Sequence, residues 1–124
     1  MKYTTFEEMP VWQKAMSLAQ KIYSLTKKLP PEETFSLTSQ IRRSGLSISG
    51  NISEGFGRKH TKDKLNFYYD ARGSLCETKN HLIYGRKVGY FATEEFKELD
   101  LLIEDIWREL NNLIAGFRIS LPQP

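Results

Sequence analysis

Apolar residues recur at steps of three and four positions in four long stretches of this 124-residue chain. That spacing places them on one face of an amphipathic α-helix, whereas a half-buried strand alternates apolar and polar residues. We therefore predict helices over residues of about 10–29, 35–54, 61–87 and 93–118, and no strands. The fourth has the longest apolar stripe: Phe96, Leu99, Leu102, Ile103, Ile106, Leu110, Leu113, Ile114 and Phe117.

Residues with known helix-end preferences set the expected boundaries. Pro10 suits the first turn of a helix, where its missing N–H costs nothing, and Pro30 with Pro31 stops the first helix. Thr61 and Thr93 are expected to cap the third and fourth helices through their hydroxyls. Gly85 and Gly89 are expected to mark the end of the third.

Four amphipathic helices joined by short turns hide their apolar stripes best by packing antiparallel around one core. The sequence thus predicts an all-α fold, an up-down-up-down four-helix bundle forming a single domain over residues 1–124. Trp12 and Trp107 are expected in this core, and residues 119–124 are expected to be a disordered tail.

Cysteine and histidine are scarce, which excludes several classes of site. The single cysteine, Cys76, allows no intrachain disulfide, and the two histidines are too few for a structural zinc site. No stretch has the apolar length of a membrane span, and the N-terminus has no apolar leader. We expect a cytoplasmic protein with no membrane association, no metal and no cofactor.

Charge is distributed unevenly along the chain although the net charge is only +3. From Gln40 to Lys64, six cations oppose two carboxylates, which gives +4. From Ala92 to Pro124, three cations oppose seven carboxylates, which gives −4. Two surfaces of opposite sign are therefore expected, suited to attracting a polyanion or a second copy of the chain.

The stretch QIRRSGLSISGNISEGFGRKH, residues 40–60, combines small, flexible and cationic residues. Gly45 and Gly50 each cost about 0.8–1 kcal/mol relative to alanine inside a helix, so close packing against another backbone is the expected compensation. Gly55 or Gly57 is expected to end this helix in a left-handed cap. The stretch lacks the spacing of a phosphate-binding loop, because Arg-Lys-His follows the glycines and no strand precedes them.

Catalytic residues are not evident in this stretch. Its serines and Glu54 lie near His60 in sequence, but a nucleophile needs a base within hydrogen-bond reach and a third group to orient that base. Glu54 is instead placed to form an ion pair with Arg58 four residues later. We therefore expect a protein that is not an enzyme.

Three motifs carry a resemblance to a known family: residues 40–43 (QIRR), 51–58 (NISEGFGR) and 71–77 (ARGSLCE). They resemble the four-helix-bundle proteins encoded by intervening sequences in bacterial 23S ribosomal RNA genes, also called S23 ribosomal proteins. That family includes the accessory variability determinants of diversity-generating retroelements. The resemblance covers Phe6 to about Phe117, and departs from the usual family pattern at Gly45, Gly50 and Ser53.

The resemblance implies an antiparallel four-helix bundle that assembles as a homopentamer with a basic surface. For the retroelement members it also implies binding to nucleic acid and to a reverse transcriptase. Most members have no established function.

Two hypotheses about function follow. In the first, cations bind the phosphates of RNA or DNA: Arg42, Arg43, Arg58, Lys59, Lys62 and Lys64. In the second, the protein is a structural adaptor whose partner is a protein such as a reverse transcriptase. Its arginines then pair with carboxylates such as Glu54 and Glu77, which would leave only the lysines for phosphate.

Overall fold

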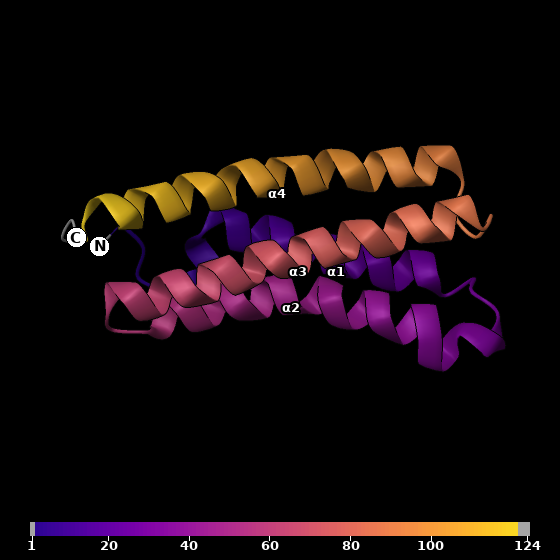
Figure 1. The fold of residues 1–124 in the computed structure, drawn as a ribbon, viewed down its shortest axis with the longest axis horizontal. Coiled ribbons are helices and arrows are strands. Elements are labelled where there is room, and N and C mark those ends of the chain that lie inside the picture. Colours follow the sequence, from indigo (N-terminus) through magenta and orange to yellow (C-terminus); the bar gives the residue numbers. More distant parts are fainter. Residues whose placement is uncertain (1, 122–124) are drawn as a thin grey trace.

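Four long helices dominate the computed structural model, which describes residues 2–121 (Figure 1). They are α1 (Pro10–Thr26), α2 (Ser39–Gly57), α3 (Thr61–Lys87) and α4 (Thr93–Ile119). Short 3-10 turns, η1 (Phe6–Glu8) and η2 (Pro31–Glu33), precede α1 and follow it, and a π-turn, η3 (Thr34–Thr38), leads into α2. The described residues contain no strand. The predicted all-α four-helix bundle is confirmed.

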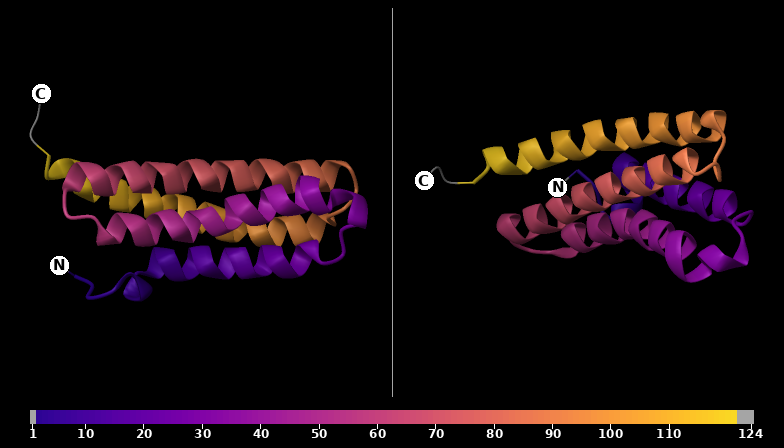
Figure 2. Two further views of the ribbon diagram at one scale, coloured as in Figure 1. Left: turned by 90° about the horizontal axis from the view of Figure 1, so that it is seen from below. Right: turned by 45° about the vertical axis from the view of Figure 1, so that its right-hand side comes forward.

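The helices run alternately up and down, so the chain begins and finishes its described course at one end of the bundle (Figures 1 and 2). One apolar core includes residues of all four helices and is centred on fully buried side chains such as Leu18, Ile48, Leu75 and Ile106. A smaller cluster of Leu65, Tyr68 and Ile114 fills the end where α3 begins and α4 finishes. These are stripe residues, so the apolar spacing identified the buried faces correctly.

Several helix ends differ from their predicted positions because of local hydrogen bonds and backbone conformation. The helix α1 ends at Thr26 rather than 29, where the Thr26 hydroxyl donates to the Ile22 carbonyl and turns lead to Pro30. The helix α2 begins at Ser39 rather than 35, because Ser36 adopts a non-helical backbone (φ −123°, ψ −107°) in the π-turn. It then runs three residues beyond the predicted end, to Gly57.

Both threonine caps are wrong by one residue. His60 and Ala92 occupy the N-cap positions of α3 and α4, and the threonines that follow them are the first helical residues. The free Ala92 N–H instead donates to the Glu95 carboxylate at 2.8 Å. Glu95 thus satisfies the N–H of the N-cap residue, whereas a threonine hydroxyl at the N-cap would have accepted from an N–H of the first helical turn.

The seam between α1 and α2 depends on the small residue at position 45. A Cβ added to Gly45 would lie 3.0 Å from Ile22 Cδ1, so this glycine makes room for a side chain of α1 and not for the expected backbone. The same explanation is wrong for Gly50, where an added Cβ would meet nothing within 4 Å.

The seam between α2 and α3 is lined by hydroxyl groups. Thr78 Oγ1 donates to Ser44 Oγ at 2.9 Å in the core, and Ser74 Oγ donates to Ser47 Oγ at 3.1 Å nearer the surface. Each buried hydroxyl thereby has a partner and adds little desolvation cost.

The two tryptophans differ in environment. Trp12 packs against the core, with its ring centroid 5.2 Å from that of Phe6. Trp107 is 38% exposed, which contradicts its predicted core position. Trp107 directly follows Ile106, which lies at the centre of the apolar stripe. Successive residues are about 100° apart around a helix, so Trp107 points away from that centre. Of the predicted tail, Ile119 is still helical and residues 120–121 form a turn; 122–124 lie outside the described residues.

Candidate nucleic-acid interface

The turn between α2 and α3 presents three exposed cations. Arg58 is the C-cap residue of α2 with extended backbone (φ −79°, ψ 147°), Lys59 follows it, and Lys62 lies in the first turn of α3. Within the described part of the chain, Lys59 and Lys62 have no carboxylate within 4.0 Å. Arg58 Nη2 lies 3.2 Å from Glu54 Oε2, which confirms the predicted pair. Its guanidinium also lies 4.7 Å from the centroid of the Phe67 ring.

Lys64 is not a surface cation, and its assignment to a phosphate-binding patch is wrong. Only 7% of the residue is exposed, and its ammonium donates to the Gly55 carbonyl at 3.2 Å and the Phe56 carbonyl at 2.7 Å. These are among the last carbonyls of α2, which have no partner inside the helix. Lys64 therefore closes α2 in place of the predicted left-handed glycine. In residues 2–121 only Gly89 has a positive φ.

Arg42 and Arg43 lie far from the α2–α3 turn. They precede Arg58, the C-cap of the same helix, by sixteen and fifteen positions, which corresponds to roughly 22–24 Å. Arg42 Nε donates to Thr26 Oγ1 at 2.8 Å, and its guanidinium lies 4.5 Å from the centroid of the Tyr23 ring.

Arg43 is also engaged within the chain. Its Nη2 donates to Gln40 Oε1 at 2.6 Å and to Glu77 Oε2 at 3.4 Å. The six predicted phosphate contacts therefore do not form one patch: two belong to helix contacts, one is buried, and three share the turn.

The structure brings two further cations to the same end, and sequence reasoning missed both. Lys2 precedes α1 and Arg118 lies in the last turn of α4. In an up-down-up-down bundle the α2–α3 turn lies at the end where α1 begins and α4 finishes (Figure 1). The topology predicted from the sequence already implied that Lys2 and Arg118 lie at the same end as the α2–α3 turn. We call the five exposed residues the basic end: Lys2, Arg58, Lys59, Lys62 and Arg118.

The carboxylates of α4 do not form a free acidic surface. Lysines of α1, of the turn after it and of α3 pair with most of them: Lys14 with Asp105 and Glu109, Lys21 with Glu98, Lys28 with Glu95, and Lys79 with Asp100 and Glu104. The negative charge counted along the fourth helix is thus largely neutralised between helices. Exposed cations without carboxylates among the described residues lie at both ends of the bundle: Lys2, Lys59, Lys62 and Arg118 at the basic end, and Lys27, Lys87 and Lys97 at the other.

The Lys14–Asp105 pair predicts a specific pH dependence. The Lys14 ammonium, 2.6 Å from Asp105 Oδ2, holds the pKa of that carboxyl below its usual value of 3.8. Because the folded-state pKa is lower than the unfolded-state pKa, the pair stabilises the fold at any pH above the unfolded-state pKa. This stabilisation is lost as pH falls towards the folded-state pKa. We expect Lys14→Met to be less stable than wild type at neutral pH, and the difference in urea titrations to shrink as pH falls below 3.8 towards the lowered pKa of Asp105. The same difference persisting in strong acid would contradict the role of this pair. Lys97→Met, which removes an exposed lysine without a carboxylate partner, is the control.

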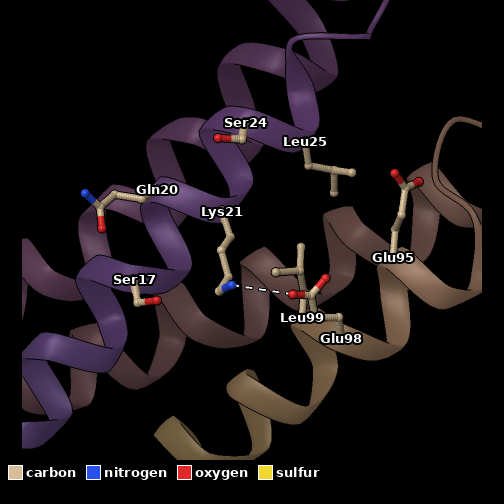
Figure 3. Close-up of a pocket in the computed structure, with 8 residues that line it drawn as sticks. All are labelled: Ser17, Gln20, Lys21, Ser24, Leu25, Glu95, Glu98 and Leu99. Atoms are coloured by element: carbon tan, nitrogen blue, oxygen red, sulfur yellow. Dashed lines mark hydrogen bonds and ion pairs between the residues drawn. The ribbon is translucent and has the colours of Figure 1, made fainter.

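A hollow of about 610 Å³ lies between α1 and α4 (Figure 3). Hydroxyl and amide groups of Ser17, Gln20 and Ser24 line the α1 side, and Lys21 points across to Glu98, 3.4 Å away. Glu95, at the same rim, pairs with Lys28 at 2.5 Å. Because its lysine is already paired with a carboxylate, this hollow does not favour phosphate.

Two serines near His60 in sequence form hydrogen bonds to the α2 backbone. Ser49 Oγ donates to the Leu46 carbonyl at 3.1 Å and Ser53 Oγ to the Gly50 carbonyl at 2.8 Å. His60 is exposed at the α3 N-cap. Within residues 2–121 there is no cluster of three or more His, Cys, Asp or Glu side chains suited to a metal ion. Nor is any helix of that region long and apolar enough to cross a bilayer.

Comparison with known proteins gives the relationship of the chain. The family model described as 23S rRNA-intervening sequence protein matches residues 7–112. The chain belongs to this family. All three motifs that carry the resemblance lie inside the matched region, as do Arg58, Lys59 and Lys62. Lys2 and Arg118 lie outside it.

A solved structure confirms that the fold is shared. It is a protein with unknown function from the S23 ribosomal protein family of Bacteroides thetaiotaomicron, 25% identical in sequence, with a TM-score of 0.76. The similarity covers 84% of this chain and 97% of that one. No curated protein matches the chain. Membership of the 23S rRNA-intervening sequence protein family therefore fixes the fold and leaves the activity open.

Proposed function

We propose that the protein is a non-enzymatic, oligomeric bundle that acts in the cytoplasm and binds RNA or DNA through phosphate contacts at its basic end. The observation that carries the proposal is the position of Lys59 and Lys62, exposed and without carboxylate partners among the described residues. Lys2, Arg58 and Arg118 surround the same end of the bundle. Clustered cations of this kind attract nucleic acid independently of sequence.

Local features support the binding of an anion at this turn. The α3 N-terminus lies here, and its N-cap residue His60 makes no side-chain hydrogen bond to the first N–H groups. Helix N-termini favour phosphate through these groups and the helix dipole. The Arg58–Glu54 pair is exposed on both sides, so it contributes only about 0–1 kcal/mol, and phosphate can displace the carboxylate at low cost.

Multiple copies would strengthen a site with so few cations. The family resemblance suggests a homopentamer, in which five basic ends would contact one nucleic acid at the same time. If each chain neutralises about two phosphates, the logarithm of affinity for a single strand falls against the logarithm of salt with a slope of about −7, and about −1.4 for one chain.

Light scattering coupled to size-exclusion chromatography, with a single-stranded RNA at several salt concentrations, tests this proposal. We expect an oligomer that shifts with RNA at low salt and releases it at high salt, with fluorescence anisotropy giving the steep slope above. A slope near zero, or no shift at the lowest salt, would contradict phosphate binding. A monomer with the shallow slope would contradict only the oligomeric part.

An adaptor role is the second candidate, and the arginine contacts favour it. Arg43 pairs with Glu77 and Arg58 with Glu54, as that hypothesis expects, whereas Arg42 bonds to the Thr26 hydroxyl and not to a carboxylate. Exposed apolar side chains such as Phe35 (94%) and Leu101 (76%) would suit a protein partner. In a retroelement member that partner would be a reverse transcriptase. An oligomer indifferent to RNA in the same chromatography would favour this role.

A further inference from the structure

An apolar cavity of about 250 Å³ lies inside the basic end. Its walls come from four separate parts of the chain. Tyr3 and Met9 close it from the N-terminal segment, Phe56 from α2, Lys64 and Tyr68 from α3, and Phe117 from α4. The volume corresponds to about eight water molecules in the liquid. Pockets of this kind, mostly apolar with a few polar groups, are typical of small-molecule sites.

Lys64 is one of two polar groups buried in this wall. Its residue is 93% buried, since 7% is exposed, and no carboxylate of residues 2–121 lies within 4.0 Å of its ammonium. Burial lowers its pKa from the ordinary value. The Gly55 and Phe56 carbonyls accept two of its three N–H groups. Capping of α2 therefore uses two N–H groups of the Lys64 ammonium, and the third is available to a ligand.

Tyr68 is the second buried polar group. The residue is 1% exposed and lines the cavity. Its ring packs 5.6 Å from that of Phe117, and an added Cβ on Gly55 would lie 2.6 Å from its Cε1. Burial raises the pKa of Tyr68 to about 12, so the hydroxyl is protonated and can donate at neutral pH.

We propose that this cavity binds a small molecule with an apolar body and one carboxylate, which accepts hydrogen bonds from the Tyr68 hydroxyl and the Lys64 ammonium. The Lys64 ammonium is a donor and the Tyr68 hydroxyl can donate, so one acceptor on the ligand satisfies both, and a carboxylate also supplies the missing counter-charge. The five cations of the basic end attract anions to the same region. Lys2 lines this cavity and also belongs to the basic end, so the site adjoins the proposed nucleic-acid contacts. Lys64 and Tyr68 are buried, whereas those contacts use exposed side chains.

Sodium octanoate is a suitable probe, with octanamide as a neutral molecule of the same length. Isothermal titration calorimetry of the full chain is expected to show octanoate binding with one site per chain. Octanamide should bind at least about tenfold more weakly, equivalent to about 1.4 kcal/mol. No octanoate binding, or equal binding of both probes, would overturn the proposal.

Two substitutions identify the cavity as the site. Tyr68→Phe removes only the hydroxyl and is expected to weaken octanoate about tenfold, with little effect on octanamide. Lys64→Met is expected to bind octanoate and octanamide equally. If this variant unfolds because α2 has lost its cap, the octanoate affinity of Tyr68→Phe alone tests the proposal. Lys59→Met with Lys62→Met is the control for binding to exposed cations, and should bind octanoate like wild type. Unchanged octanoate affinity in Tyr68→Phe, or lost affinity in the surface control, would place binding elsewhere and overturn the proposal.

Discussion

Gly85→Ala is expected to destabilise the fold by about 2 kcal/mol although alanine is the better helix former. An added Cβ would lie 2.2 Å from Cε2 and 2.4 Å from Cδ2 of Phe91. Phe91 cannot retreat easily, because it is 3% exposed and its N–H donates to the Gly85 carbonyl at 3.3 Å. Overpacking a rigid ring of this kind typically costs about 1–3 kcal/mol. Urea unfolding should show a lower midpoint with an unchanged slope.

Gly73→Ala is the matched control in the same helix. An added Cβ at Gly73 meets nothing within 4 Å, so the substitution should stabilise the fold by about 0.8–1 kcal/mol through helix propensity. The difference between the two variants isolates the contact with Phe91. Phe91→Leu combined with Gly85→Ala should cost less than the sum of the single changes, because the smaller side chain makes room. Equal stability of Gly85→Ala and wild type would mean that the turn after α3 repacks freely.

Apolar spacing predicted the four helices and their buried faces because one physical quantity, burial of a stripe, determines both. Boundaries depend on individual contacts, which spacing does not contain. Gly85 was expected at a loosened helix end, yet it is a buried residue of α3, and the left-handed residue of that turn is Gly89 (φ 91°). Close approach of Phe91, a residue of the following turn, explains why position 85 is small.

The six predicted cations do not share one surface, for a reason of geometry. Residue type and local charge located the cations of the α2–α3 turn, but gave no indication that Lys64 would fold back onto the end of α2. They also grouped Arg42 and Arg43 with Arg58, although a helix of nineteen residues separates its two ends by roughly 28 Å. Lys2 and Arg118 were missed because they join the site through topology and not through sequence proximity.

Charge reversal of the turn lysines, Lys59→Glu with Lys62→Glu, is expected to abolish the salt-dependent part of nucleic-acid binding. Removing about two phosphate contacts per chain reduces the slope of affinity against salt by about 1.4 for each chain, and by about 7 for a pentamer. Both lysines are exposed and without carboxylate partners in the described residues, so the fold and the oligomer should be unaffected. Anisotropy titrations with single-stranded RNA, and light scattering of the variant alone, measure the two effects.

The comparison variant is Arg42→Glu with Arg43→Glu, which changes the same number of charges at the other end of α2. These arginines contact Thr26, Tyr23 and Glu77, so their reversal disturbs the seams of α2 with α1 and α3. We expect this variant to lose stability in urea and to keep most of the salt slope if it folds. The opposite pattern, in which only the arginine variant releases RNA, would move the nucleic-acid site to the start of α2. The adaptor role would be favoured by a third outcome. In it the arginine variant loses the oligomer, and both variants bind RNA as wild type does.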